Sequence, residues 1–385
     1  MKILMFSTDK NILRKDSVAQ KRMIDYGKLV KELHILVLSK GKNRIAESGQ
    51  VEMGNSICVY PISSRWGWLC FWRAYKVGGS IISKYCFNVE TGIITTQDPF
   101  ETGLVGYCLK LKFKLPLQLQ IHTDFLSPYF SKESLKNRLR VIMGKTLVSR
   151  VDGLRVVSDR IRKSLLSFSS KIKLSQIIVL PIAVDVRTIS DIFPLVDLHQ
   201  KYSGYGFIVL MASRLTIEKN IAMAIKAMKA VVQTYPQVLL LIVGDGPKRQ
   251  ELMRLIQKLQ LQNNIIFESW TNDLFSYYKT ADLFLLTSNY EGGARAPAEA
   301  MAAGLPVVMT DVAPAQEVVL NDINGFVVPV GDYLFLSRSI MELISDTIKR
   351  DSFSDQAKKT AQGFLSKEQY LIKYQTALEG LIKKK

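Results

Sequence analysis

Short apolar runs separated by longer mixed segments recur through the first half of the chain. The runs read ILMFS, LHILVL, ICVYPI, GIITT and LQLQI between residue 3 and about residue 121. Apolar runs of about four to eight residues are typical of strands that are buried on both faces of a parallel sheet. A helical pattern over 132–147 and the run GLRVVS continue the alternation. This order of strands and helices predicts an α/β domain with a mainly parallel sheet.

The second half repeats this architecture after a segment of looser periodicity. The segment SDIFPLVDLHQKYSGYG is typical of a linker, and a new series of strands begins at FIVLMAS. The series continues through VLLLIVG, NIIFE, ADLFLLTS, LPVVMT and NGFVVPV, and the tail from residue 351 has a polar helical pattern. At 385 residues, the chain is long enough for two domains.

The expected fold class is therefore α/β, with two Rossmann-like, doubly wound domains that face each other across a cleft. The expected boundaries are a first domain over 1–185, a linker over 186–205, a second domain over 206–350 and a helical tail over 351–385. We expect the tail to pack back toward the first domain. Ligands of such folds bind beyond the carboxyl ends of the strands, so both domains would line the cleft.

The stretch NYEGGARAPAEAMAAG, residues 289–304, predicts a loop and a helix between two buried strands. Pro297 suits the first turn of a helix, and Gly304 suits the position just past its end. Glu291 then lies in the loop and Glu299 just inside the helix. Backbone N–H groups and the helix dipole favour a phosphate in the crevice beyond the strand. The two carboxylates beside it require a different partner, for which neutral hydroxyl groups are suitable.

Two cations follow the strand FIVLMAS in the sequence SRLTIEKN. Arg214 and Lys219 are spaced to hold a diphosphate, the arginine through its planar fork and the lysine as a point charge. The alternative is a solvated loop in which Arg214 pairs with Glu218. The turn in IVGDGPKRQEL is a weak candidate for a phosphate site, because G-x-G-P also occurs in ordinary turns.

His122 and Asp124 follow the apolar run LQLQI in the first domain. A histidine and an aspartate two residues apart at the end of a strand are candidates for function in the cleft. The alternative is a structural role, which is more common for a single histidine.

Several kinds of site are excluded by missing motifs. No D-x-D pair is present to hold a metal-bound nucleotide diphosphate, so no metal and no cofactor are expected. The GKT at 144–146 lacks the first glycine of a P-loop, because Leu139 stands in its place. G-x-G-x-x-G after a strand and G-x-S-x-G are also absent, which argues against nicotinamide enzymes and serine hydrolases of those types.

The four cysteines are far apart and include no C-x-x-C pair, which argues against a zinc site and a disulfide framework. No uncharged apolar run of 18 residues and no signal peptide are visible. We therefore expect a cytoplasmic protein.

Positive charge is concentrated in the first half of the chain. Residues 1–190 hold 31 Lys and Arg against 14 Asp and Glu, a net +17, whereas residues 191–385 hold 21 against 20, a net +1. The stretch 65–75, RWGWLCFWRAY, contains Trp66, Trp68 and Trp72 beside basic residues. Tryptophan and arginine together suit a lipid headgroup region. We expect peripheral attachment to the inner face of an anionic membrane; the alternative is that the tryptophans pack in a core or line an acceptor groove.

Taken together, these motifs resemble the retaining family 4 glycosyltransferases of the GT-B fold. The specific part is the pair Glu291 and Glu299 in E-x7-E, followed by AMAAGLPVV, with SRL…EKN, GDGP and NGFVV in order around it. The second domain matches throughout, and the first domain matches mainly in architecture and in the position of HTD. The resemblance implies that the first domain is the acceptor side and that the second domain binds the nucleotide sugar.

The resemblance also implies a role for each candidate residue. Arg214 and Lys219 would hold the diphosphate of the donor, Glu299 the ribose hydroxyls and Glu291 the hydroxyls of the transferred sugar. His122 would lie near the reacting carbon. The implied catalytic residues are Glu291, His122, Arg214 and Lys219. The implied donor-binding residues are Ser213, Arg214, Lys219, Gly246, Gly292, Gly293, Ala294, Arg295 and Glu299. The implied acceptor-side residues are Asp124 and Arg14.

Two features depart from the family pattern. The loop after the first strand, STDKNILRKDSVAQKR, contains no glycine, although the family usually has a glycine-rich loop there. In EGGARAPAE, Gly293 stands where the family often has an aromatic residue and Ala294 where it often has glycine. These departures bear on acceptor contacts and on the shape of the sugar pocket.

The expected function is a retaining, metal-independent glycosyltransferase that moves a hexosyl group from a nucleotide-diphosphate sugar. The acceptor would be a glycan or a lipid-linked molecule in the synthesis of cell-envelope polysaccharide or glycolipid. Expected partners are thus the nucleotide sugar, the acceptor and an anionic membrane surface, without nucleic acid. Two alternatives are a sugar-nucleotide epimerase of the same fold and a basic nucleic-acid-binding protein.

Overall fold

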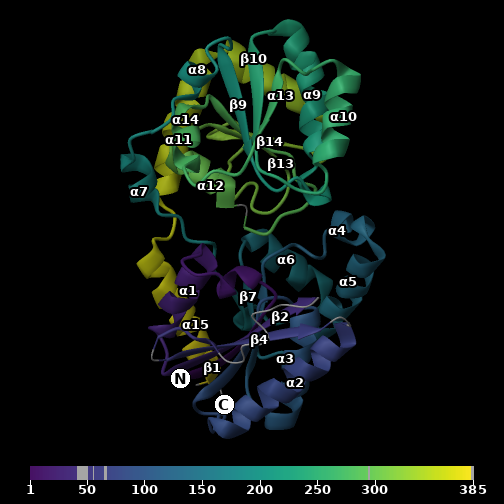
Figure 1. Ribbon diagram of the computed structural model, residues 1–385, viewed down its shortest axis with the longest axis vertical. Coiled ribbons are helices and arrows are strands. Elements are labelled where there is room, and N and C mark those ends of the chain that lie inside the picture. Colours follow the sequence, from purple (N-terminus) through teal and green to yellow (C-terminus); the bar gives the residue numbers. More distant parts are fainter. Residues whose placement is uncertain (41–50, 55, 65–66, 294, 383–385) are drawn as a thin grey trace. The chain divides into compact units, whose positions relative to one another are not determined.

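The computed structural model describes residues 1–40, 51–54, 56–64, 67–293 and 295–382 (Figure 1). The chain forms two compact units. Unit 1 holds residues 1–126, 134–181 and the C-terminal segment from Glu368, and unit 2 holds residues 127–133 and 182–367.

Unit 1 contains an eight-stranded sheet in the order β3-β4-β2-β1-β5-β6-β7-β8. Its strands are β1 (Lys2–Ser7), β2 (Glu32–Lys40), β3 (Val51–Glu52), β4 (Ile57–Ser64), β5 (Gly92–Thr96), β6 (Leu117–Ile121), β7 (Gly153–Val156) and β8 (Ile177–Val179). Its helices are η1 (Lys10–Leu13), α1 (Val18–Gly27), α2 (Gly67–Lys84), α3 (Glu101–Phe113), α5 (Leu135–Val148), α6 (Asp159–Phe168), η3 (Leu174–Gln176) and α15 (Lys367–Ile382).

All pairings in this sheet are parallel except that of β3 with β4. Every residue of β5 and β6 is buried, so both faces of the central sheet are covered. This burial explains why these strands appear as continuous apolar runs rather than alternating ones.

Unit 2 contains a six-stranded sheet in the order β11-β10-β9-β12-β13-β14, and all its pairings are parallel. Its strands are β9 (Phe207–Ala212), β10 (Val238–Val243), β11 (Ile265–Glu268), β12 (Leu283–Leu286), β13 (Val307–Thr310) and β14 (Gly325–Val328). Its helices are α4 (Pro128–Glu133), α7 (Val186–Asp191), α8 (Leu198–Lys201), η4 (Ile217–Lys219), α9 (Ile221–Thr234), α10 (Arg249–Leu259), α11 (Leu274–Thr280), α12 (Arg295–Ala302), α13 (Tyr333–Ser345) and α14 (Thr347–Gln362).

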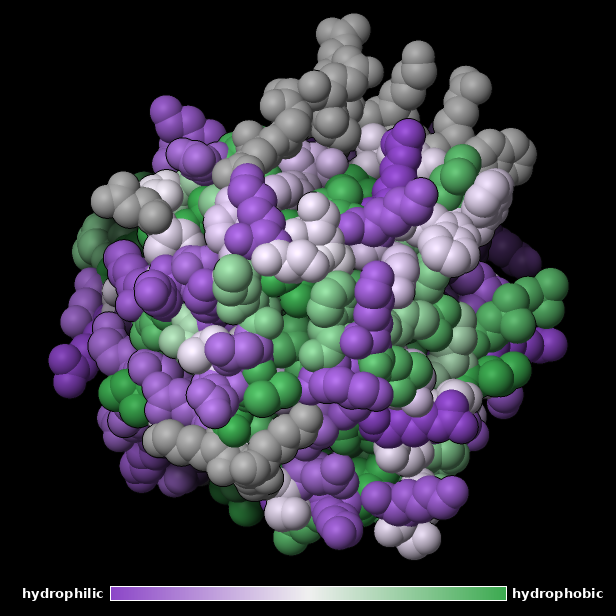
Figure 2. Space-filling model, turned by 90° about the horizontal axis from the view of Figure 1, so that it is seen from below, coloured by the Kyte–Doolittle hydropathy of each residue, from purple (hydrophilic) through white to green (hydrophobic). Residues whose placement is uncertain are grey.

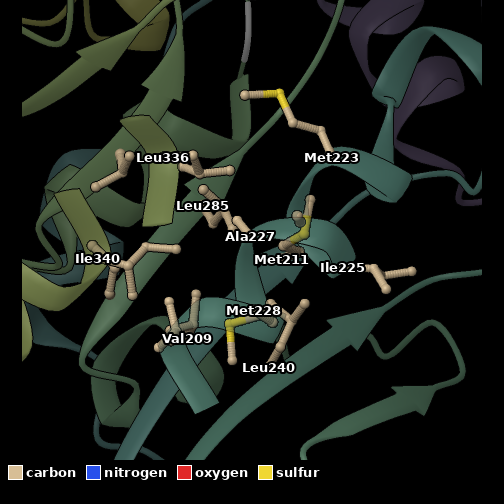
Figure 3. Packing of buried hydrophobic residues seen from close by; sticks show 14 of the residues in the cluster. Val209, Met211, Met223, Ile225, Ala227, Met228, Leu240, Leu285, Leu336 and Ile340 are labelled. Carbon is tan, nitrogen blue, oxygen red and sulfur yellow. The ribbon is translucent and has the colours of Figure 1, made fainter. Parts of the chain in front are cut away.

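Strand β9 shows how unit 2 is built in layers. Ile208 and Leu210 belong to one hydrophobic cluster, with α11, α12 and α14. Val209 and Met211 belong to another, with α9, α10 and α13. Figure 3 shows part of the second cluster, where Val209 and Met211 lie near side chains of α9 and α13. Successive residues of a strand point to opposite faces, so helices cover both faces and the unit is doubly wound.

The predicted α/β class with doubly wound, Rossmann-like units is therefore confirmed. The course of the chain differs from the predicted boundaries in three places. The segment 186–205 contains α7 and α8, whose Ile189 and Leu198 are buried in the core of unit 2. Helix α14 belongs to unit 2 and α15 to unit 1, so the tail is shared between the units. Helix α4 belongs to unit 2 although its neighbours in sequence belong to unit 1.

Candidate functional site

A lysine and a glutamate meet at the carboxyl edge of the sheet in unit 2. Lys219 ends η4, which follows β9, and Glu291 lies in the loop after β12. Because β9 and β12 are parallel neighbours, their ends lie at the same edge of the sheet. The Lys219 Nζ lies 2.5 Å from the Glu291 Oε1, and the Ser288 hydroxyl donates to the same oxygen over 2.7 Å.

The two loops that carry this ion pair are fastened together by other hydrogen bonds. The Thr287 hydroxyl donates to the carbonyl of Lys219 over 3.0 Å, and the backbone N–H of Asn289 donates to that of Glu218 over 2.7 Å. The Asn220 amide donates to the Asn289 side chain over 2.9 Å. The side chains of Lys219 and Glu291 are 17% and 13% exposed, so the pair is shielded but accessible.

Glu299 on α12 accepts hydrogen bonds from its own helix and from α11. The Arg295 Nε donates to its Oε1 over 2.6 Å, and the Tyr278 hydroxyl donates to its Oε2 over 3.4 Å. Burial and the neighbouring carboxylate raise the pKa of Tyr278 well above its usual value, so this phenol stays protonated and donates. Glu299 is 9% exposed and therefore has a fixed orientation.

Arg214 forms the ion pair with Glu218 that was the alternative interpretation of the sequence. Its Nη2 lies 3.3 Å from the Glu218 Oε1, four residues along, and its side chain is 78% exposed. An exposed pair of this kind contributes little to stability. Arg214 lies on the same connection between β9 and α9 as Lys219.

The GDGP turn packs against the SRL loop. The backbone N–H of Leu215 donates to the carbonyl of Asp245, and that of Lys248 donates to the carbonyl of Leu215, both over 3.0 Å. A Cβ on Gly246 would lie 2.5 Å from the Leu215 carbonyl oxygen, so this position requires glycine. The buried hydroxyl of Ser213 has no hydrogen-bond partner among the described residues. These contacts give Gly246 a packing role, whereas donor binding by Gly246 and Ser213 stays a prediction.

The loop before α12 contains the other predicted donor residues. Gly292 is buried, Gly293 is half-buried and Arg295 is exposed, whereas Ala294 lies outside the described residues. The predicted helix begins at Arg295, and Pro297 lies in its first turn as expected.

Tyr290 is a residue of this region that the sequence did not single out. Its hydroxyl hydrogen-bonds to the carboxylate of Glu133, and its ring packs edge-on against Phe130 at 5.3 Å between centroids. Both partners lie on α4, so this contact joins α4 to the loop that carries Glu291. Burial and the bond to Glu133 raise the pKa of Tyr290. Tyr290 and Glu133 are 157 positions apart, so no local sequence pattern could have predicted their contact.

The predicted acceptor-side residues lie in unit 1. His122 follows the end of β6, and its Nε2 lies 3.2 Å from the Oε1 of the buried Gln120. Asp124 is 8% exposed, and Arg14 lies exposed just after η1. The structure thus brings Lys219, Glu291 and their loops together in one unit and places His122 in the other.

Within the described residues, no group of three or more His, Cys, Asp or Glu side chains is arranged to hold a metal ion. Across the same part of the chain, no helix is both long enough and apolar enough to span a bilayer.

Comparisons with known proteins bear on the same residues. Residues 201–360 match the family described as glycosyl transferases group 1. The chain is 32% identical over 174 residues to the poly(glycerol-phosphate) alpha-glucosyltransferase of Bacillus subtilis, which is 45% of this chain and 26% of that protein. It is 29% identical over 253 residues to the alpha-monoglucosyldiacylglycerol synthase of Streptococcus pneumoniae, which is 62% of this chain and 55% of that protein. The chain therefore spans about half or less of these relatives.

Solved structures share the complete fold. The sucrose-phosphate synthase of Thermosynechococcus elongatus aligns over all of both chains with a TM-score of 0.82 and 18% identity. Anabaena HepE in complex with UDP-glucose aligns over all of both chains with a TM-score of 0.74 and 22% identity. Residues 201–360 thus resemble the glycosyl transferases group 1 family, and the chain as a whole shares the fold of these solved structures.

Proposed function

We propose that this protein is a retaining, metal-independent glycosyltransferase that moves a hexosyl group from a nucleoside diphosphate sugar to a glycan or lipid-linked acceptor. The product would contribute to cell-envelope polysaccharide or glycolipid. The observation that carries the proposal is the Lys219–Glu291 pair, with Glu299 nearby in α12, at the carboxyl edge of the sheet in a group 1 domain. That edge is where doubly wound sheets bind nucleotides.

The residues fit the chemistry of a leaving diphosphate. The bond between the sugar C1 and the diphosphate oxygen breaks, and the electron pair leaves with the diphosphate. Lys219 and Arg214 would stabilise this negative charge, as preorganised cations do in other phosphate-leaving reactions. The acceptor hydroxyl then attacks C1 from the same face, and its proton passes to the departing diphosphate oxygen, so the configuration at C1 is retained.

A covalent intermediate on Glu291 is the competing mechanism. In this structure the Oε1 of Glu291 already accepts from Lys219 and from Ser288, which lowers its nucleophilicity. These contacts favour a role in which Glu291 orients Lys219 and binds sugar hydroxyls.

The names of similar proteins support the choice of donor and acceptor. One structural neighbour was solved with UDP-glucose, and one relative is a glycosyltransferase named for a diphosphoundecaprenol acceptor. We propose a nucleotide sugar of this class as the donor and a lipid-linked molecule as one class of acceptor.

Peripheral attachment to the inner membrane face is the second part of the proposal. Helices α2, α3 and α5 carry three, two and four basic residues, and Glu101 is their one acidic residue. Helix α3 packs against both α2 and α5. Large apolar side chains are exposed on α2 and α5: Trp68, Trp72, Leu135, Leu139 and Ile142. Figure 2 shows a surface on which hydrophobic and hydrophilic residues are interspersed. Arg65 and Trp66 lie outside the described residues.

Incubation with radiolabelled nucleotide sugars tests the proposed activity. Transfer of label to a lipid or glycan extract supports it, whereas a new sugar epimer without transfer would indicate the epimerase alternative. The Lys219→Ala variant serves as the control, because it keeps the fold-determining strands but removes the cation beside the diphosphate. Equal transfer by this variant would contradict the assigned site.

A further inference from the structure

A groove of about 570 Å³ lies within unit 1, separate from the ion pair of unit 2. It opens beside the carboxyl ends of β1 and β2, between α2, α3 and α5. Its volume falls in the range of roughly 300–1,000 Å³ that is usual for small-molecule sites. All its lining residues belong to unit 1, so the groove is defined by that unit alone.

The walls of the groove are apolar. Leu38, Phe71, Leu104 and Met143 line it, together with Trp68 and Trp72. The two tryptophans are 62% and 51% exposed. Large exposed aromatic side chains beside an apolar groove are typical of a surface that binds an apolar ligand.

One part of the lining is positively charged. Arg140 donates through its Nε to both carboxylate oxygens of Glu101, over 3.1 and 3.0 Å, and the Lys136 Nζ lies 3.3 Å from the same group. One carboxylate shared by two cations leaves a net positive charge, and the exposed Lys10 adds another. An apolar channel with a cationic end complements an aliphatic chain that carries an anionic group.

We propose that this groove binds the hydrocarbon chain of a lipid acceptor, with the phosphate of that lipid beside Lys10, Lys136 and Arg140. That the bound lipid is an acceptor rests on the proposed transferase function. The binding of the hydrocarbon chain does not, because binding requires no transfer. The exposed tryptophans and basic side chains of α2 and α5 would lie at the bilayer surface. A chain could then enter the groove without leaving apolar surroundings.

A brominated amphiphile tests the groove directly. The probe is 12-bromododecyl phosphate, kept below its critical micelle concentration and without vesicles or nucleotide sugar. Bromine quenches tryptophan fluorescence on contact, and the Trp270→Phe variant removes an exposed tryptophan of unit 2 from the background. We expect saturable quenching that dodecyl phosphate reverses and butyl phosphate does not.

Charge placed inside the groove should abolish this binding. Leu104→Glu and Met143→Glu each put a carboxylate on the apolar wall, and we expect at least roughly tenfold weaker binding for each. Leu139→Glu is the matched control, because Leu139 is 63% exposed on α5 and does not line the groove. Lys10→Ala should weaken binding of the phosphate roughly fivefold and leave binding of neutral dodecyl glucoside unchanged.

The outcomes separate this proposal from the proposed activity. Absence of saturable quenching would overturn it, as would wild-type affinity in both groove variants or equal loss in Leu139→Glu. Binding without any detectable transfer would leave the groove intact and count against the activity. Transfer to a soluble glycan with no chain binding would overturn the groove proposal alone.

A different observation in unit 1 concerns His122. A buried polar chain runs from α15 to this residue through Arg155 on β7. Arg155, 2% exposed, donates through Nη2 to the Tyr370 hydroxyl over 2.6 Å and through Nη1 to the Gln120 Oε1 over 2.7 Å. The Gln120 amide donates to the Thr95 hydroxyl over 2.9 Å.

These contacts determine which ring nitrogen of His122 carries a proton. Arginine can only donate, so the oxygen of Gln120, rather than its amide nitrogen, faces Arg155. The same oxygen lies 3.2 Å from the His122 Nε2. The Nε2 must therefore donate, and in the neutral imidazole the Nδ1 is left as an acceptor for a hydroxyl.

We infer that Gln120 and Arg155 are positioning residues, which hold His122 in one tautomer and one ring orientation. Imidazole NMR of ¹⁵N-histidine-labelled protein tests this without any substrate, and the His122→Asn variant identifies the signal among the three histidines. We expect a hydrogen-bonded Nε2–H signal that is lost to exchange with water in Gln120→Met. Gln120→Glu keeps an acceptor oxygen, so it should retain the signal and raise the pH midpoint of His122.

The Nε2–H signal in Gln120→Met decides the inference. It is measured on protein whose melting temperature shows that it is folded. An unchanged signal would overturn it, as would a wild-type ring protonated on Nδ1 alone. If Gln120→Met does not fold, the wild-type tautomer and the midpoint in Gln120→Glu decide it instead.

Discussion

At the scale of single residues, the two carboxylates have different partners, and we expect different roles for them. Glu291 lies in a loop and pairs with Lys219, whereas Glu299 on α12 accepts from Arg295 of the same helix and from Tyr278 of α11. A carboxylate that is already fixed can accept ligand hydroxyls without losing entropy on binding. We therefore expect Glu299 to bind a part of the proposed donor that stays fixed, and Glu291 to bind a part that changes during the reaction.

The first prediction follows from this difference. Glu299→Ala should weaken binding of uridine diphosphate and of its sugar alike, by about 1–3 kcal/mol for a lost charged acceptor. Glu291→Ala should spare the bare diphosphate, because Lys219 remains, and should strongly reduce transfer. Isothermal titration of both ligands measures this, with Glu251→Ala on the exposed face of α10 as the control. Equal loss of diphosphate affinity in the Glu291 and Glu299 variants would show that the roles are wrongly assigned.

The second prediction concerns the turn beneath the site. Gly246→Ala should destabilise the protein by about 1–3 kcal/mol, because the new Cβ would press on the backbone of Leu215. The loop 213–215 would have to move, so the affinity for a nucleoside diphosphate should fall as well. Urea unfolding and titration check the two effects, and Gly204→Ala, which meets nothing within 4 Å, is the matched control. Unfolding free energies that match for the two variants would contradict the packing role.

At the scale of elements, the strands were the most predictable part of the chain. Runs such as VLLLIV and LFLL are buried on both faces, so burial alone fixes their composition. The meeting of Lys219 and Glu291 was predictable in outline, because each follows a strand and parallel strands share an edge. The contact of Tyr290 with α4 could not be predicted, because it depends on α4 joining unit 2 rather than unit 1. The hydrogen bond of His122 to Gln120 depends in turn on Arg155, 35 positions away from Gln120.

The third prediction belongs to α15. Gly380 lies inside this helix, and a Cβ there would meet nothing within 4 Å. Gly380→Ala should therefore stabilise the protein by about 0.5–1 kcal/mol, through helix propensity and a less flexible unfolded chain. Thermal unfolding checks this, with Gly153→Ala as the contrast, because a Cβ there would lie 2.8 Å from Leu381 of the same helix. A lower melting temperature for Gly380→Ala would count against the packing described for α15.

At the scale of the whole molecule, the excess positive charge lies in the first half of the chain, and the helices α2 and α5 of unit 1 expose large apolar side chains beside their basic residues. Each basic residue near an anionic bilayer contributes about 1 kcal/mol, so five or six would hold the protein reversibly. At physiological ionic strength, ions in solution screen this attraction beyond a distance of about 8 Å. Added salt shortens that distance, so attachment should be sensitive to salt.

The fourth prediction is that the protein floats with anionic liposomes. Binding should fade with added salt and fall when Trp68 and Trp72 are both replaced by alanine, whereas Trp270→Ala in unit 2 should have no effect. Flotation in a density gradient measures the bound fraction, and circular dichroism checks the fold. Equal recovery with neutral and anionic liposomes would refute membrane attachment through charge.

The membership of α15 in unit 1 has a consequence for the order in which the protein is made. Arg155 is buried in unit 1, but its partner Tyr370 is translated more than two hundred positions later. All of unit 2, through residue 367, leaves the ribosome before that partner does. A nascent chain can therefore complete its second unit first, while the buried arginine of the unit that was synthesised earliest waits for the acceptor of its Nη2 donor.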